Sequence, residues 1–138
     1  MRALKLFILT ISAAAVIAGV CILPRRICFT DGKNYEFYCG DSSKNCKVVT
    51  SENPALDKLL LKEVCGESCG YDAIELESFL KNYGGKVVFK EELSDSVNYY
   101  CTADLPYSVT LRGYEINLHI CVRKDGVKVG SPIIFGGY

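Results

Sequence analysis

The side chains with the most reactive chemistry in this chain are its eight cysteines and its single histidine, His119. Cys65 and Cys69 are separated by three residues. Thioredoxin-like redox sites instead use two intervening residues, placed at the start of a helix. A redox or metal site built on Cys65 and Cys69 is therefore an alternative hypothesis, and a metal site would need further convergent ligands from elsewhere in the chain.

His119 and Cys121 lie two residues apart in an alternating segment, so a strand would place both on one face. A thiol and an imidazole can act as nucleophile and base. Same-face neighbours on a strand are about 7 Å apart, however, which is too far for a direct hydrogen bond. We therefore assign no catalytic residue. Asn117, His119 and Arg123, together with Tyr99, could instead form a polar recognition face, and the alternative is an ordinary solvated face of the sheet.

Seven cysteines follow residue 27, a density that is high for a protein of a reducing compartment. Cys39 and Cys46 flank a predicted turn, where a disulfide could join the two strands of a hairpin. Cys101 and Cys121 lie on separate predicted strands and could form a bridge if those strands are neighbours. Reduced cysteines that serve as small buried apolar side chains are the alternative.

The N-terminal region contains 18 consecutive residues without a charge, at positions 6–23. As a helix this segment would span ~27 Å, just enough to cross the hydrocarbon core of a membrane. We predict an uncleaved membrane anchor at residues 1–27, with a signal peptide cleaved after Ala18 as the alternative. The basic residues on its two flanks slightly favour an outer location for a single domain at residues 28–138.

The chain has no net charge, but its charges are distributed unevenly. Residues 28–138 hold 12 basic and 16 acidic side chains, which gives this segment a net charge of −4. This sign argues against nucleic-acid binding, which depends on a basic surface. No glycine-rich phosphate-binding loop opens a predicted helix, and we expect no cofactor.

Periodicity and turn residues predict an α+β fold with an antiparallel sheet packed on one or two helices. One face of the sheet would cover the helices, and the other would be polar. Pro132 implies that the last strand is an edge strand or contains a bulge, and an edge could pair with a partner's strand. The predicted strands are 35–39, 46–50, 86–90, 97–102, 109–111, 115–123 and 127–135, and the predicted helices begin near Pro54 and Asp72 and end at Gly66 and Gly84-Gly85.

The C-terminal region resembles the YwmB family of Gram-positive bacteria. The matching positions are Asn117-Leu118, Arg123, Val129-Gly130, Pro132-Ile133 and Tyr138. A helix end, two glycines and a strand at residues 79–89 extend the resemblance. It implies a secreted or membrane-attached protein with a fold like that of TATA-box-binding protein. It implies no DNA binding and supplies no catalytic residues.

These observations lead to a hypothesis of a small membrane-anchored extracytoplasmic module that binds or assembles with an unknown protein partner without catalysis. The anchor would be residues 6–23, and the protein would be secreted if it were cleaved after Ala18. One alternative is a thiol-dependent envelope enzyme or redox protein that uses Cys65 and Cys69, or Cys121. Another is an intracellular metal-binding domain with reduced cysteines and the opposite topology.

Overall fold

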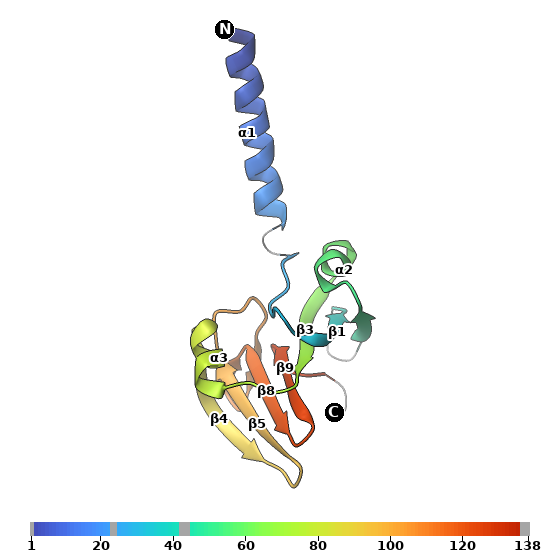
Figure 1. Cartoon of the computed structure of the whole chain (residues 1–138), viewed down its shortest axis with the longest axis vertical. Helices are drawn as coiled ribbons and strands as arrows, with labels where there is room; N and C mark the ends of the chain where they lie inside the picture. The colour runs from blue at the N-terminus through green and yellow to red at the C-terminus, as the bar shows by residue number, and fades with distance from the viewer. Residues whose placement is uncertain (1, 23–24, 42–44, 136–138) are drawn as a thin grey trace.

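The computed structural model describes residues 2–22, 25–41 and 45–135 (Figure 1). It begins with helix α1 (Arg2–Ile22), which projects away from the rest of the chain. Its segment Leu4–Cys21 is long and apolar enough to cross a membrane, and none of this segment is buried against other parts of the chain. The exposed apolar surface of α1 is what a membrane anchor or a signal sequence requires.

The remaining elements form an α+β arrangement, which confirms the predicted fold class. Seven strands form one antiparallel sheet in the order β2-β1-β3-β9-β8-β5-β4, and β6 and β7 form a separate hairpin. In chain order the elements are β1 (Lys33–Cys39), β2 (Lys47–Ser51), α2 (Pro54–Leu60), β3 (Val64–Tyr71), α3 (Leu76–Asn82), β4 (Lys86–Glu92), β5 (Ser96–Thr102), β6 (Val109–Leu111), β7 (Tyr114–Ile116), β8 (Leu118–Arg123) and β9 (Gly126–Ser131).

One face of the sheet, here called the core face, holds the main apolar cluster. Phe79 and Leu80 of α3 pack against this cluster, and the Phe29 ring lies 6.5 Å from the Phe79 ring. Burial of these side chains on a half-apolar sheet is the main driving force for the fold. The buried members are Phe29, Tyr35, Cys69, Cys101, Leu118, Ile120, Val127 and Val129.

Helix α3 starts later than predicted but ends where predicted. The Glu75 carboxylate accepts hydrogen bonds from the amides of Glu77 and Ser78, so Glu75 caps the helix. Asp72, the predicted start, instead pairs with Lys33. The helix stops before Gly84, whose φ of +60° is a left-handed conformation that glycine adopts without steric cost.

Strand β3 was missed by the sequence patterns, which extended the preceding helix to Gly66. The helix α2 ends at Leu60, and β3 pairs with both β1 and β9. A Cβ on Gly66 would lie 2.7 Å from the carbonyl oxygen of Ser131, so close strand packing requires glycine here. Small residues in β3 carry weak local preference, and pairing on both sides determines their conformation.

The last strand does not lie at an edge, so this prediction was wrong. β9 lies between β3 and β8, and it ends at Ser131, before Pro132 can interrupt a ladder of hydrogen bonds. The following segment, residues 132–135, turns over the opposite face of the sheet, here called the second face. Ile134 is buried beside Gly130, and the ring of Phe135 lies 4.7 Å from that of Tyr38. The sheet edges are β2 and β4.

Candidate functional site

The second face of the sheet carries three rings that stack across neighbouring strands. The rings of Phe89 on β4 and Tyr100 on β5 are 4.5 Å apart, and those of Tyr100 and His119 on β8 are also 4.5 Å apart. The guanidinium of Arg112 lies 5.0 Å from the centre of the Phe89 ring. Because Phe89 is opposite Tyr100 and Tyr100 opposite His119, the strand register produces this stack.

His119 is a buried structural residue, which corrects its predicted place on an open recognition face. Only 2% of its surface is exposed. The amide of Ile134 donates to Nδ1 at 3.2 Å, so Nε2 carries the proton and donates to Oδ1 of Asn98 at 3.0 Å. Burial lowers the pKa of His119 to about 4, so the imidazole is neutral at physiological pH.

The other predicted recognition residues do not gather around His119. Asn117 clamps the backbone of Ala103: its Oδ1 accepts from the Ala103 amide at 2.5 Å, and its Nδ2 donates to the Ala103 carbonyl at 2.6 Å. Tyr99 lies opposite Ile120 and packs on the core face. Of the four predicted residues, Arg123 alone lines a groove on the second face.

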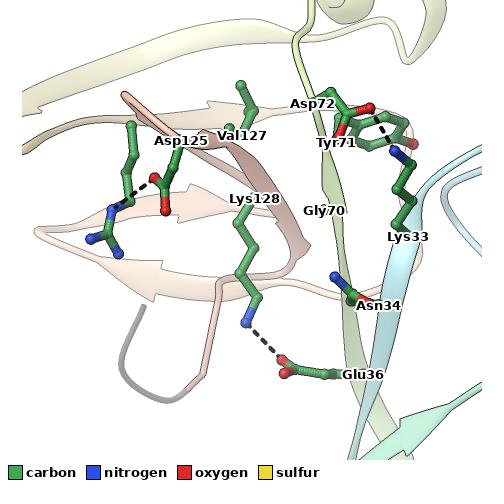
Figure 2. Close-up of a pocket in the computed structure, with 11 residues that line it drawn as sticks. Lys33, Asn34, Glu36, Gly70, Tyr71, Asp72, Asp125, Val127 and Lys128 are labelled. Atoms are coloured by element: carbon green, nitrogen blue, oxygen red, sulfur yellow. Dashed lines mark hydrogen bonds and ion pairs between the residues drawn. The ribbon is translucent and has the colours of Figure 1, made fainter.

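This groove, here called the Gly70 groove, has a volume of about 370 Å³ and lies over β3 (Figure 2). It opens because Gly70 has no side chain and because the pairing of β1 with β3 is irregular between Lys33 and Glu36. A Cβ on Gly70 would have only ordinary contacts, the nearest atom being the Lys33 carbonyl oxygen at 3.6 Å. The groove is therefore a consequence of a missing side chain and a displaced neighbouring strand.

Charged side chains of both signs surround the Gly70 groove, and each described cation lies near a carboxylate. Lys128 pairs with Glu36 at 2.8 Å, and Lys33 pairs with Asp72 at 2.5 Å (Figure 2). The Lys128–Glu36 pair is half-buried, whereas the Lys33–Asp72 pair is exposed. The Lys128–Glu36 pair joins β9 to β1, so it holds these two charges of the groove in defined positions, whereas the Lys33–Asp72 pair joins β1 to the residue that follows β3.

Arg123 is held more loosely than the two lysines of the groove. Its guanidinium nitrogens lie 3.7 Å from Oδ2 of Asp95 and 3.7 Å from Oδ1 of Asp125. Both distances exceed the normal length of a hydrogen bond between a guanidinium and a carboxylate. Arg123 is thus held by two long ion pairs rather than by a hydrogen-bonded one.

All eight cysteines are free thiols, so the structure contains neither predicted disulfide. Cys101 lies opposite Leu118, on the core face, whereas Cys121 lies opposite Asn98, on the second face. The prediction of a disulfide between Cys101 and Cys121 is therefore wrong, because the two thiols lie on opposite faces of the sheet. Cys39 and Cys46 are close enough for Cys46 to raise the pKa of Cys39, after the larger effect of burial.

Cys65 and Cys69 do not form a paired site either, since both lie on β3 four residues apart, or about 13 Å along an extended strand. Burial raises the pKa of Cys69 to about 12 and also raises the pKa of Cys65 and Cys121. Across the part of the chain that the structure describes, no three His, Cys, Asp or Glu side chains are arranged to hold a metal ion.

A buried ion pair that the sequence patterns did not indicate joins α2 to β3. The ammonium of Lys58 pairs with the Glu67 carboxylate, and their side chains are 2% and 0% exposed. Lys58 also donates to the carbonyl of Arg26, and the other oxygen of Glu67 accepts from the amide of Cys28. The pair thereby fastens residues 26–28, which follow α1, to the core face of the sheet.

The electrostatics of this cluster keep Cys28 protonated and Lys58 charged. Burial, followed by the charge of Glu67, raises the pKa of Cys28 to about 12. Burial alone would lower the pKa of Lys58, but the neighbouring acidic groups, with the charge and hydrogen bond of Glu67 among them, outweigh burial and raise the pKa. The ring of Tyr107 lies 5.1 Å from the Lys58 ammonium and adds a cation–π contact. A neutral thiol beside a paired ammonium is a structural arrangement rather than an activated nucleophile.

Comparison of the chain with protein-family models, with curated proteins and with solved structures returns no match. The resemblance of the C-terminal region to the YwmB family therefore stays an expectation, and its Tyr138 lies outside the described residues. Functional interpretation rests on the groove, the thiols and the buried ion pair themselves.

Proposed function

We propose that this chain is a single-span membrane protein that carries a small non-catalytic binding domain on the outer side of the cell membrane. In this proposal α1 is the anchor, and a protein partner binds in the Gly70 groove. The observation that carries the proposal is the groove itself: an open, charged depression on a sheet of seven strands, with its charges held in place by pairs between strands.

The position of the groove suits a partner that approaches from outside the membrane. In Figure 1, α1 leaves the domain at one end, and the turn between β8 and β9 lies at the other. That turn contributes Asp125 and Gly126 to the groove. Because both cations and carboxylates line the opening, a peptide segment with both signs of charge would complement it.

The state of the thiols favours binding over thiol catalysis. A nucleophilic cysteine needs a lowered pKa, but burial raises the pKa of each cysteine in the alternative enzyme hypothesis: Cys65, Cys69 and Cys121. The neutral His119 is engaged by Asn98 and Ile134 and is buried, so it is poorly placed to act on a substrate. The resemblance to the YwmB family is a further argument for a location in the cell envelope.

The proposed topology can be tested with a new cysteine in the exposed turn between β8 and β9. Cells that produce the Lys124→Cys variant are treated with a membrane-impermeant maleimide, and wild type, with its exposed Cys21 in α1, serves as the control. We expect the variant to gain one label in intact cells. A label that appears only after lysis would contradict an outer location of the domain.

Binding in the groove can be tested by filling it. Gly70→Val adds methyl groups that project from β3 into the groove, whereas Gly70→Ala adds only a Cβ that fits without strain and is the matched control. A photo-crosslinking residue at Asp125 reports the partner in cells, and one at the exposed Glu77 of α3 is the control position. We expect an adduct from position 125 that survives Gly70→Ala and is lost with Gly70→Val. Equal adducts in both variants, or equal adducts from position 77, would contradict the proposal.

A further inference from the structure

Three cysteines lie at one end of the sheet, where β1 finishes and its two neighbours begin. Cys39 is the last residue of β1, Cys46 directly precedes β2, and Cys65 is the second residue of β3. Cys39 lies opposite Lys47 on one side and opposite Val64 on the other. The register therefore brings three thiol-bearing residues from separate parts of the sequence to the same end of β1.

Gly40, which follows Cys39, brings the two flanking segments together. Its amide donates to the carbonyl of Glu63 at 3.0 Å, so it is tied to the segment that leads into β3. A Cβ on Gly40 would lie 2.8 Å from the carbonyl oxygen of Asn45 and 3.2 Å from the Cα of Cys46. A glycine at the end of β1 thus permits the segment before β2 to pack closely against it.

Cys65 is directed toward this junction by an irregularity in the strand pairing. The register changes from Tyr38 opposite Gly66 to Cys39 opposite Val64, so Cys65 is the extra residue of a bulge. Its Sγ lies 3.3 Å from the Tyr38 carbonyl oxygen and donates to it. After the larger effect of burial, Cys46 raises the pKa of Cys65, and Cys39 raises it less, so both cysteines lie near Cys65.

We propose that Cys46 and Cys65 form a dithiol–disulfide site that joins β2 to β3 across the end of β1. The oxidant is a small-molecule or protein disulfide. The thiolate of one cysteine attacks the oxidant to form a mixed disulfide and releases one thiol. The thiolate of the second cysteine then attacks the mixed disulfide and releases the other thiol. Cys46 and Cys65 together lose two protons and two electrons, and the oxidant is reduced to two thiols.

The pairing of Cys46 with Cys65 is favoured over Cys39 with Cys46 for two geometric reasons. The Cα of Cys46 packs closely against Gly40 at the end of β1, and the bulge leaves Cys65 outside the strand pairing at that same end, beside the carbonyl of Tyr38. The pairing also differs from the Cys65 and Cys69 pair, which β3 holds apart. The bridge would secure β2, an edge strand, to β3 in the interior of the sheet. A disulfide of this kind is typical of proteins in an oxidising compartment. The proposed site does not depend on a partner in the Gly70 groove.

The test uses the full chain in detergent micelles, incubated in a glutathione buffer that contains an excess of the oxidised form. Free thiols are then blocked, and the unreduced protein is digested by proteases that cleave after Lys47, Lys62 and Glu67. We expect one linked peptide pair that contains Cys46 and Cys65 and has lost two hydrogen atoms. The same pair should form in Cys39→Ser and in Cys101→Ser, whose thiol lies on the core face.

Two results would overturn this proposal. One is a bridge mapped to another pair, such as Cys39 with Cys46, in the wild-type chain. The other is recovery of Cys46 and Cys65 as blocked thiols or as glutathione adducts while the domain keeps its native tyrosine spectrum. The wild-type map decides between these results, so the test does not depend on whether any variant folds.

Discussion

The substitution Glu67→Gln tests whether the buried pair with Lys58 fastens residues 26–28 to the domain. Glutamine keeps an oxygen that can accept from the Cys28 amide, so this hydrogen bond can persist. It removes the negative charge, however, and leaves the Lys58 ammonium buried without its counterion. The substitution therefore isolates the electrostatic part of the interaction.

The expected cost follows from the burial of both side chains, which are 2% and 0% exposed. Removing one partner of a buried ion pair leaves an uncompensated charge and typically costs about 3–5 kcal/mol. Replacing both partners, as in Lys58→Met with Glu67→Leu, removes both charges and should cost less than either single change. The double variant thus separates the cost of an unpaired charge from the net contribution of the pair.

The assay is urea unfolding of the full chain in detergent, followed by tyrosine fluorescence. The chain has nine tyrosines and no tryptophan, and α1 has no tyrosine, so the signal reports the domain alone. Asp72→Asn is the matched control because it breaks the exposed Lys33–Asp72 pair, whose side chains are 63% and 84% exposed. Exposed pairs contribute less than about 1 kcal/mol.

The reasoning is refuted if Glu67→Gln lowers the free energy of unfolding by no more than Asp72→Asn does. It is also refuted if the double variant is less stable than Glu67→Gln alone, since that result would assign the stability to specific contacts rather than to charge compensation. In the expected case, the single variant should also make the backbone before Cys28 more sensitive to proteases than it is in wild type.

Three further predictions concern the sheet. Burial lowers the pKa of His119 from 6.5 to about 4, so protonation of His119 destabilises the folded state. The contribution of the neutral imidazole to the free energy of unfolding should be fully present above pH 6.5, and about 3 kcal/mol should be lost as the pH drops toward 4. In urea unfolding, His119→Gln should abolish this part of the pH dependence. Asn117→Ala removes both hydrogen bonds to Ala103 and should lower the free energy of unfolding by about 1–3 kcal/mol, and an effect within error of wild type would contradict the clamp. Oxidation should stabilise wild type by about 3 kcal/mol, as expected for a loop of roughly 20 residues between Cys46 and Cys65, and should not stabilise Cys46→Ser.

The apolar helix, most strands and the α+β class could be predicted because each depends on local patterns. The uncharged run at residues 6–23 is read directly from the sequence, and strict alternation identified β8. β3 could not be predicted, because its glycines, cysteines and serine carry little strand preference and its conformation comes from pairing with β1 and β9.

The functional residues were harder to predict than the fold because their environment depends on contacts distant in sequence. Alternation placed His119 on a polar face, but the segment after Pro132 covers that face and buries it. The Gly70 groove depends on a residue without a side chain, and the Lys58–Glu67 pair joins a helix to a strand that the patterns missed. Only Arg123 could be named in advance as part of the groove.

A single strand connects the three features that matter most to the proposals. In β3, Cys65 faces the end of β1, Glu67 holds Lys58 on the core face, and Gly70 opens the groove on the second face. Glu67 and Gly70 are three residues apart, or about 10 Å along the strand. A partner in the groove would therefore lie on the opposite face of the sheet from the Lys58–Glu67 pair, farther along β3 from the point at which residues 26–28 leave the domain toward α1. Because β3 is hydrogen-bonded to β1 and β9, it connects the Gly70 groove rigidly to the Lys58–Glu67 pair that holds residues 26–28. A disulfide between Cys46 and Cys65 would further restrain the start of β3.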